Sequence, residues 1–282
     1  MIIVKLMGGL GNQMFQYAAA RGLSDETIYL DLSFLDRYSQ STESFTARKY
    51  ELDLFGNLKA KKLNGFIARI LCHTGRFAFL KIFLPKRWNN FTVIGDNTIE
   101  VIDSKKNYIL DGYFQNEQLF KEKSISIKQE FIFPTETDNL ASLSNQVKNK
   151  HNSVAIHVRR GDYLKPNIGK HHPVLDIEYY KKAIEYINSK IKNPFFYIFS
   201  DDPIWCESNF TFLNFGYKII EKRYTDWESM YLMSVCKHNI IANSSFSWWG
   251  AWLNKHEIKI VIAPKFWFPK LQNPASEDWI KI

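Results

Sequence analysis

Four polar or charged side chains crowd together where an apolar run of the sequence ends. The stretch SVAIHVRRGDY, residues 153–163, begins with small and apolar residues and then presents His157, Arg159, Arg160 and Asp162. An arginine at the end of a strand suits a phosphate group, because its planar guanidinium donates two hydrogen bonds in a fixed fork. The segment therefore predicts a site for an anionic ligand.

The two arginines of this stretch are expected to play different parts. Side chains alternate between the two faces of a strand, so His157 and Arg159 project to the same side. Arg160 then lies on the other side or in the turn, where we expect it to pair locally with Asp162. An arginine–aspartate pair that only pins the loop is the alternative to ligand binding.

Two adjacent carboxylates mark a second strand end. The segment FSDDP, residues 199–203, places Asp201 and Asp202 before a proline. Because adjacent carboxylates repel each other, a binding partner or a structural role is expected to stabilise the pair. They could bind a metal, accept hydrogen bonds from a ribose or a base, or cap the following helix, for which the proline is typical. No D-x-D triplet occurs in the chain, so a metal–diphosphate arrangement is not supported.

A third cluster, NSSFSWW at 243–249, places small hydroxyl residues between a predicted strand and a predicted helix. The first N–H groups of a helix and nearby hydroxyls form a favourable site for a diphosphate. Simple capping of the helix by Asn243 or Ser244 is the alternative.

The fourth cluster is GGLGNQ at 8–13, which follows a predicted strand and opens a predicted helix. The third glycine of a dinucleotide fingerprint would fall on Met14, so the fingerprint fails. Its glycines, Gly9 among them, let backbone approach a ligand closely. Asn12 and Gln13 supply uncharged hydrogen bonds of the kind that hold sugar hydroxyls.

These motifs need parallel strands to bring them to one edge of a sheet. Apolar patterning predicts strands within 1–6, 26–32, 89–96, 106–114, 153–158, 194–202, 217–221, 239–245 and 257–264, and helices within 12–24, 176–191, 225–239 and 246–254. The alternation predicts α/β domains with helices on both faces of parallel sheets. The polar stretch 134–152 suggests two domains, 1–150 and 151–282, with a cleft between them.

The charge of the chain favours anionic partners. Its 282 residues carry a formal net charge of +8, which suits nucleic acid, acidic lipid or a phosphorylated small molecule. A solvated basic surface is the alternative. The lysines are scattered and no helix-turn-helix or RNA-recognition signature appears, so we expect no nucleic-acid partner.

The sequence predicts a cytoplasmic protein. Its three cysteines, Cys72, Cys206 and Cys236, are far apart and form no C-x-x-C motif, which is typical of a reducing compartment. No signal sequence or run of 18 apolar residues is present. The apolar and basic stretch 65–88 is a candidate for peripheral contact with the inner face of a membrane, and a partly buried helical pair is the alternative. We expect a bacterial origin because no membrane anchor is visible.

The four motifs together resemble a known family. GGLGNQMFQYA, HVRRGDY, FSDDPIWC and NSSFSWWGAWLN, in this order and spacing, resemble the α-1,2-fucosyltransferases, family 11 of the glycosyltransferases. The resemblance implies a GT-B architecture of two Rossmann-like domains, an N-terminal acceptor-side domain and a C-terminal donor-binding domain. It also implies GDP-β-L-fucose as donor, inversion at the anomeric carbon, a β-galactoside-terminated glycan as acceptor, and no metal or other cofactor.

The resemblance also implies roles for individual residues. Arg159 corresponds to an arginine that contacts the β-phosphate of the donor, with His157 beside the nucleotide and Arg160 on the donor side. The pair Asp201 and Asp202 corresponds to the part that holds guanine or ribose. Ser244, Ser245 and Phe246, after Asn243, correspond to the phosphate-side loop, and Gly9, Asn12 and Gln13 to the junction of donor and acceptor. Asp162 is the nearest candidate for a general base, or it orients one of the arginines.

Two rivals to this reading remain open. One is a transferase that uses another nucleotide sugar, and the other is a carbohydrate- or nucleotide-binding protein without catalysis. Incubation with a panel of GDP- and UDP-sugars separates them from each other and from the α-1,2-fucosyltransferase.

The missing D-x-D triplet leads to a first prediction, that transfer needs no divalent metal. Arg159 and a helix N-terminus can stabilise the leaving diphosphate in the metal's place. The rate of transfer measured in EDTA should equal the rate in magnesium. Loss of transfer in EDTA, restored by manganese, would contradict this and make Asp201 and Asp202 candidate metal ligands.

Overall fold

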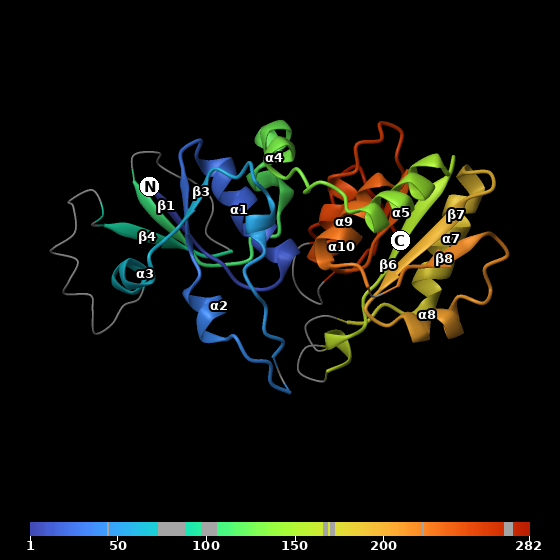
Figure 1. Ribbon diagram of the computed structural model, residues 1–282, viewed down its shortest axis with the longest axis horizontal. Coiled ribbons are helices and arrows are strands. Elements are labelled where there is room, and N and C mark those ends of the chain that lie inside the picture. Colours follow the sequence, from blue (N-terminus) through green and yellow to red (C-terminus); the bar gives the residue numbers. More distant parts are fainter. Residues whose placement is uncertain are drawn as a thin grey trace. The chain divides into compact units, whose positions relative to one another are not determined.

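The computed structural model in Figure 1 describes residues 1–282 except 44, 73–87, 89, 97–105, 166–168, 170–172, 222 and 268–272. The described residues form two compact units. Unit 1 comprises Met1–Thr42 and Thr46–Pro134, and unit 2 comprises Glu43–Phe45 and Thr135–Ile282.

The division between the units lies at the start of the polar stretch 134–152 instead of at residue 150. The reason is helix α5 (Asp138–Asn149), which packs against α9 (Asp226–Val235) of unit 2. The α5 residues Leu140, Leu143 and Val147 are buried at helical spacing. Polar residues surround them and weaken the apolar pattern, so the sequence predicts a domain boundary in this stretch and no helix.

Unit 1 contains a parallel sheet of order β3-β2-β1-β5-β4. Its strands are β1 (Ile2–Lys5), β2 (Ile28–Asp31), β3 (Ala60–Lys62), β4 (Phe91–Ile94) and β5 (Asn107–Leu110). Its helices are α1 (Leu10–Leu23), α2 (Ser33–Arg37), α3 (Gly65–Cys72) and α4 (Ser124–Glu130), with 3₁₀ turns at Leu52–Leu54, Glu117–Leu119 and Lys121–Lys123. The strand–helix–strand unit β1-α1-β2 at the start of the chain is the arrangement that the sequence predicted.

A buried ion pair joins the first and last helices of unit 1. The Arg21 guanidinium of α1 lies 3.0 Å from the Glu130 carboxylate of α4, and both side chains are buried. The Tyr17 hydroxyl donates a 2.5 Å hydrogen bond to the same carboxylate. The three groups satisfy one another, which offsets the cost of burying the charges and fixes α4 against α1.

The stretch 65–88 falls only partly within the described residues. Its first turns form α3, whose Ala68 and Leu71 pack in one core cluster with Ile3 and Ile109 of the sheet. Residues 73–87 lie outside the described residues, and membrane contact by this stretch stays a prediction. Among the residues that the structure describes, no helix is long and apolar enough to cross a membrane.

Unit 2 contains a second parallel sheet, of order β11-β10-β9-β6-β7-β8. Its strands are β6 (Ser153–Val158), β7 (Phe195–Ser200), β8 (Tyr217–Ile219), β9 (His238–Ile240), β10 (Val261–Ala263) and β11 (Ile280–Lys281). Its helices are α5, α7 (Ile177–Lys190), α8 (Pro203–Asn209), α9 and α10 (Ser245–Trp252), with a 3₁₀ turn at Asp162–Leu164.

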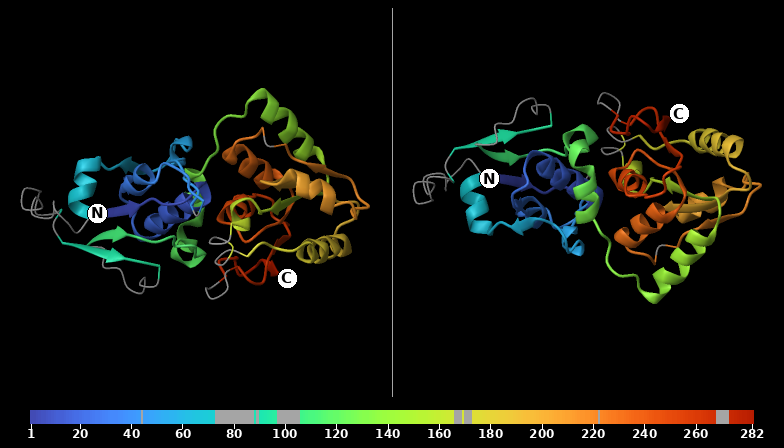
Figure 2. Two further views of the ribbon diagram at one scale, coloured as in Figure 1. Left: turned by 90° about the horizontal axis from the view of Figure 1, so that it is seen from below. Right: turned by 90° about the horizontal axis from the view of Figure 1, so that it is seen from above.

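Helices cover both faces of this second sheet, as Figure 2 lets the reader follow. Val154, Ile156 and Val158 of β6 share a core cluster with Tyr180 of α7 and Cys206 of α8. The intervening residues of β6 point to the other face, toward α9 and α10. This is the period-two alternation that the sequence predicted for residues 153–158.

Candidate active site

The site lies at the point where the strand order of unit 2 reverses. From β6 the chain proceeds to β7 and β8 on one side, and it returns to β9 on the other side of β6. In open α/β sheets the crevice outside the carboxyl ends of two such strands is where ligands bind. The loops after β6 and β9 flank this crevice, and the Tyr163 hydroxyl joins them by donating a 3.0 Å hydrogen bond to the Asn243 carbonyl.

Arg159 is held between two carboxylates in the loop after β6. Its Nη2 donates to Asp162 Oδ1 at 2.5 Å, and its Nη1 lies 2.8 Å from Asp201 Oδ2. The guanidinium also lies 5.4 Å from the centre of the Tyr163 ring. Burial disfavours the cation, but Asp201 and Asp162 outweigh it and raise the pKa of Arg159 above its usual value. A fixed, fully charged fork therefore stands at the switch point.

Arg160 points away from Arg159, toward α8. Its Nε donates to Asp202 Oδ2 at 3.2 Å, and its guanidinium stacks 4.2 Å from the centre of the Trp205 ring. The expected pair of Arg160 with Asp162 is not formed. The 3₁₀ turn at Asp162–Leu164 folds the Asp162 carboxylate back onto Arg159 instead, three residues earlier.

The two adjacent carboxylates after β7 have different tasks. Asp202 caps α8, since its Oδ1 accepts from the Trp205 N–H at 3.2 Å and Pro203 follows as the first helical residue. The capping alternative is thus confirmed for Asp202. Asp201 caps nothing: its Oδ1 accepts a 2.9 Å hydrogen bond from the Arg160 N–H while its Oδ2 faces Arg159.

Gly161 is needed for this arrangement. A Cβ atom at this position would lie 2.5 Å from Asp201 Oδ2. Any larger residue would therefore push Asp201 away from the arginines.

Among the residues that the structure describes, no group of three or more His, Cys, Asp or Glu side chains could hold a metal ion.

His157 is buried beside the same loop and is neutral at physiological pH. It is 5% exposed, and its ring lies 5.5 Å from that of Phe246 on α10. Burial lowers the pKa of His157 to about 3; Asp201 opposes this shift and Arg159 adds to it. Its Nδ1 atom is buried and has no hydrogen-bond partner among the described residues.

The loop after β9 presents backbone and amide groups. Ser244 precedes α10 without a capping bond from its side chain, and its N–H donates to the Ala242 carbonyl at 2.8 Å. The simple capping alternative is thus not seen for Ser244. The first intrahelical bond runs from the Trp248 N–H to the Ser244 carbonyl, so Ser245 and Phe246 occupy the first turn, at the positive end of the helix dipole.

Asn243 carries a second buried acceptor whose partner is not seen. Its Nδ2 donates to the Pro173 carbonyl at 2.9 Å, while its Oδ1 is buried without a partner among the described residues. Buried polar atoms are nearly always hydrogen-bonded in folded proteins. Asn243 Oδ1, His157 Nδ1 and Asp201 Oδ2 are therefore candidate atoms for contact with a ligand.

The GGLGNQ motif of unit 1 is built differently from the prediction. Gly8 has a φ of 74°, and a Cβ there would lie 2.4 Å from Asn12 Nδ2. Gly9 precedes α1, and the Asn12 side chain accepts a 2.9 Å hydrogen bond from Gln115.

Gln13 is fully buried. Its Nε2 donates to the carbonyls of Gly8 and Lys49 at 2.9 and 2.7 Å, and its Oε1 accepts from the Glu51 N–H at 3.0 Å. Its side chain fixes a distant loop to the start of α1, and its place at the junction of donor and acceptor stays a prediction.

Sequence reasoning missed two aromatic residues of the unit 2 site, Tyr163 and Trp205. Tyr163 joins the loops after β6 and β9, and Trp205 stacks on Arg160. Aromatic residues at such positions are usually core residues, so their types alone carried no signal. Only their positions, one residue after Asp162 and two residues after Pro203, could have drawn attention to them.

The fold has relatives among solved structures of glycosyltransferases. The structure titled NodZ α-1,6-fucosyltransferase soaked with GDP-fucose matches with a TM-score of 0.52 and 14% identity, over 89% of this chain and 92% of that one. Fucosyltransferase NodZ from Bradyrhizobium matches with a TM-score of 0.51 and 12% identity, over 88% of this chain and 91% of that one. With its two parallel α/β sheets and this likeness, the chain has the GT-B fold.

The sequence defines the family within that class. The profile of Glycosyl transferase family 11 matches residues 1–282, and the chain belongs to this family. It is 35% identical to the O-antigen biosynthesis glycosyltransferase WbnK of Escherichia coli, over 98% of this chain and 99% of that protein. It is 33% identical to an α-1,2-colitosyltransferase of Escherichia coli, over 100% of this chain and 98% of that protein. A human galactoside α-(1,2)-fucosyltransferase 1 is 30% identical over 36% of this chain and 28% of its own length.

The different surroundings of the arginines predict different effects of their removal. Arg159→Ala should lower the rate of transfer about 100- to 1,000-fold, as expected for a lost contact to a developing charge. Arg159→Lys should recover little, because an ammonium cannot replace the fork. Arg160→Ala should instead lower the free energy of unfolding by about 1 kcal/mol, through its lost stacking on Trp205 and its lost ion pair. Steady-state kinetics and urea unfolding measure the two effects, and an exchange of the two behaviours would contradict the assignment.

The burial of His157 predicts a ring that stays neutral in acid. Its folded pKa of about 3 lies below the ordinary 6.5, so between these pH values the unfolded chain binds more protons than the folded one. His157 therefore contributes stability above about pH 6.5 that is lost as the pH falls toward 3. The His157 Hε1 resonance, assigned through His157→Gln, should not shift between pH 5 and 8 in an NMR titration. A titration midpoint near 6.5 would contradict this.

Proposed function

We propose that the chain transfers L-fucose from GDP-β-L-fucose, with inversion, to a hydroxyl of a β-galactoside-terminated glycan and forms an α-1,2 linkage. The observation that carries the proposal is the charged fork of Arg159, held by Asp162 and Asp201 at the switch point of unit 2. A guanidinium carries five N–H donors, so those that the two carboxylates leave over can bind the diphosphate of a GDP-sugar. The names of the relatives, α-1,2-colitosyltransferase and galactoside α-(1,2)-fucosyltransferase, support the linkage.

In this proposal unit 2 binds the donor and unit 1 the acceptor. As the bond to the anomeric carbon breaks, negative charge builds on the β-phosphate. Arg159 and the first turn of α10, with Ser245 and Phe246, stabilise that charge without reorganisation. His157 Nδ1 and Asn243 Oδ1 form hydrogen bonds with the nucleotide, which would give both atoms the partner that they lack among the described residues.

The carboxylates of the site act through Arg159 in this proposal. Asp162 was the nearest candidate for a general base, but its Oδ1 is committed to Arg159. We assign it the positioning of Arg159, together with Asp201. The attacking hydroxyl then loses its proton late, and water suffices as the acceptor.

A second donor is favoured by the comparisons. The α-1,2-colitosyltransferase aligns with the whole chain, whereas the human fucosyltransferase aligns with about a third of it. Colitose is fucose without its 3-hydroxyl group, so the two donors differ in one polar group. A site that hydrogen-bonds this hydroxyl rejects the deoxy sugar by about 10⁴-fold, whereas a site that leaves it in water discriminates little.

A donor panel tests the proposal. We expect purified protein with lactose as acceptor to release GDP from GDP-fucose, and NMR of the product to show an α-1,2 linkage. GDP-colitose, GDP-mannose and UDP-galactose are the competing donors, and Arg159→Ala is the inactive control. Faster transfer from GDP-colitose would favour the second donor, and transfer only from UDP-galactose would overturn both.

A further inference from the structure

A pocket of about 710 Å³ lies at the opposite edge of the unit 2 sheet from Arg159. Three loops form it, 150–152 before β6, 192–194 before β7 and 214–216 before β8. Because these strands are parallel, their amino ends share one edge, and the switch-point crevice lies at the other. The pocket is therefore separate from the candidate active site.

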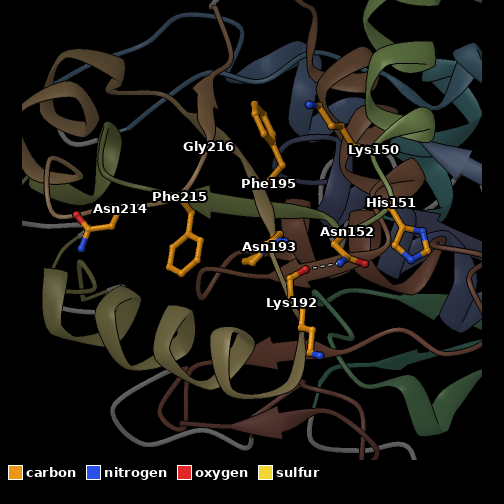
Figure 3. Close-up of a pocket in the computed structure, with 10 residues that line it drawn as sticks. Lys150, His151, Asn152, Lys192, Asn193, Phe195, Asn214, Phe215 and Gly216 are labelled. Atoms are coloured by element: carbon orange, nitrogen blue, oxygen red, sulfur yellow. Dashed lines mark hydrogen bonds between the residues drawn. The ribbon is translucent and has the colours of Figure 1, made fainter.

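The pocket is basic. Lys150, His151 and Lys192 line it, and none of the described residues that line it is acidic. The Lys237 ammonium lies 3.4 Å from His151 Nδ1 and adds a further positive charge. Figure 3 shows Lys150 at one side of the pocket and Lys192 at another. Without a carboxylate among these residues, the pocket favours a ligand that brings negative charge.

Aromatic rings form part of the pocket wall between these charges. The ammonium of Lys150 lies 4.6 Å from the centre of the Phe195 ring. Phe195 has room for its ring only because residue 216 is glycine, since a Cβ there would lie 2.7 Å from its Cδ2 atom. In the view of Figure 3, Phe195 and Phe215 lie between Asn214 at one end and Asn152 at the other. Such rings provide apolar faces of the size of a sugar ring.

Neutral amides complete the pocket. Asn152, Asn193 and Asn214 belong to its three loops, one to each. The Asn152 amide donates to the Lys192 carbonyl, as the dashed line in Figure 3 marks, and the Asn152 carbonyl accepts from the Phe195 N–H at 2.9 Å. Two of the loops are thus fixed to each other before any ligand binds, which lowers the entropic cost of binding.

We infer that this pocket binds an acidic sugar residue of a glycan, outside the transfer site. Sugar rings carry C–H groups on their faces and hydroxyls around their rims, which match phenyl rings and amides, and a carboxylate matches the lysines. A lone phosphate would not need the rings, and a membrane anchor would not need the half-buried Phe195 beside the more exposed Phe215. The site holds an acidic glycan without taking part in transfer.

Calorimetric titration with a hexamer of α-1,4-linked galacturonate tests the inference. The methyl-esterified hexamer has the same rings without charge and should bind about tenfold more weakly. Lys150→Ala/Lys192→Ala should weaken binding of the acidic hexamer about tenfold. The control Lys182→Ala/Lys255→Ala removes two exposed lysines elsewhere in unit 2 and should bind as the wild type does.

Gly216→Ala separates stacking from charge. It displaces the Phe195 ring and removes no charged group, so it should weaken binding of the acidic hexamer severalfold. Equal affinity in this variant, or in Lys150→Ala/Lys192→Ala, would overturn the inference. So would lysine-dependent binding to phosphatidylglycerol vesicles without binding to the hexamer, which would make the surface a membrane contact. Transfer to lactose is independent of this pocket, so its failure would bear on the proposed function alone.

Discussion

The ion pair between Arg159 and Asp201 is the interaction on which the site depends. Asp201 receives the Arg160 N–H with one oxygen and faces the Arg159 guanidinium with the other, so one carboxylate fixes both the course of the loop and the fork that it presents. An arginine in water samples many rotamers, and holding it costs up to about 2 kcal/mol of side-chain entropy. Two carboxylates and the ring of Tyr163 hold the Arg159 side chain in place, so this entropy is already lost before any donor binds.

This arrangement explains why the other polar groups of the loop take structural parts. Asp202 accepts hydrogen bonds from the N-terminus of α8 and from Arg160. The Arg160 guanidinium in turn stacks on Trp205. These contacts fix the loop on the α8 side of the sheet. On the α10 side, the neutral His157 packs against the ring of Phe246.

Local patterns predicted most of the described strands and the helices α1, α7, α9 and α10, and tertiary contacts decided the rest. Apolar alternation located β6 and β7, and the carboxylate of Glu228 accepts from the Thr225 N–H at 2.8 Å, as the predicted start of α9 requires. Sequence alone could not show that Asp162 turns back to Arg159, because that depends on the 3₁₀ turn after Gly161. Nor could it show that the Gln13 amide forms hydrogen bonds with the backbone of residues 49 and 51, which lie far along the chain.

The central claim is that Asp201 acts on transfer by holding Arg159. A double-mutant cycle on kcat/KM with Arg159→Lys, Asp201→Asn and the double variant measures this coupling directly. If Asp201 serves mainly to hold the fork, then Asp201→Asn should lower kcat/KM little further in a chain that already carries Arg159→Lys. The double variant should therefore be nearly as active as Arg159→Lys. Losses in the two single variants that multiply in the double variant would show that the residues act independently, and would contradict the account.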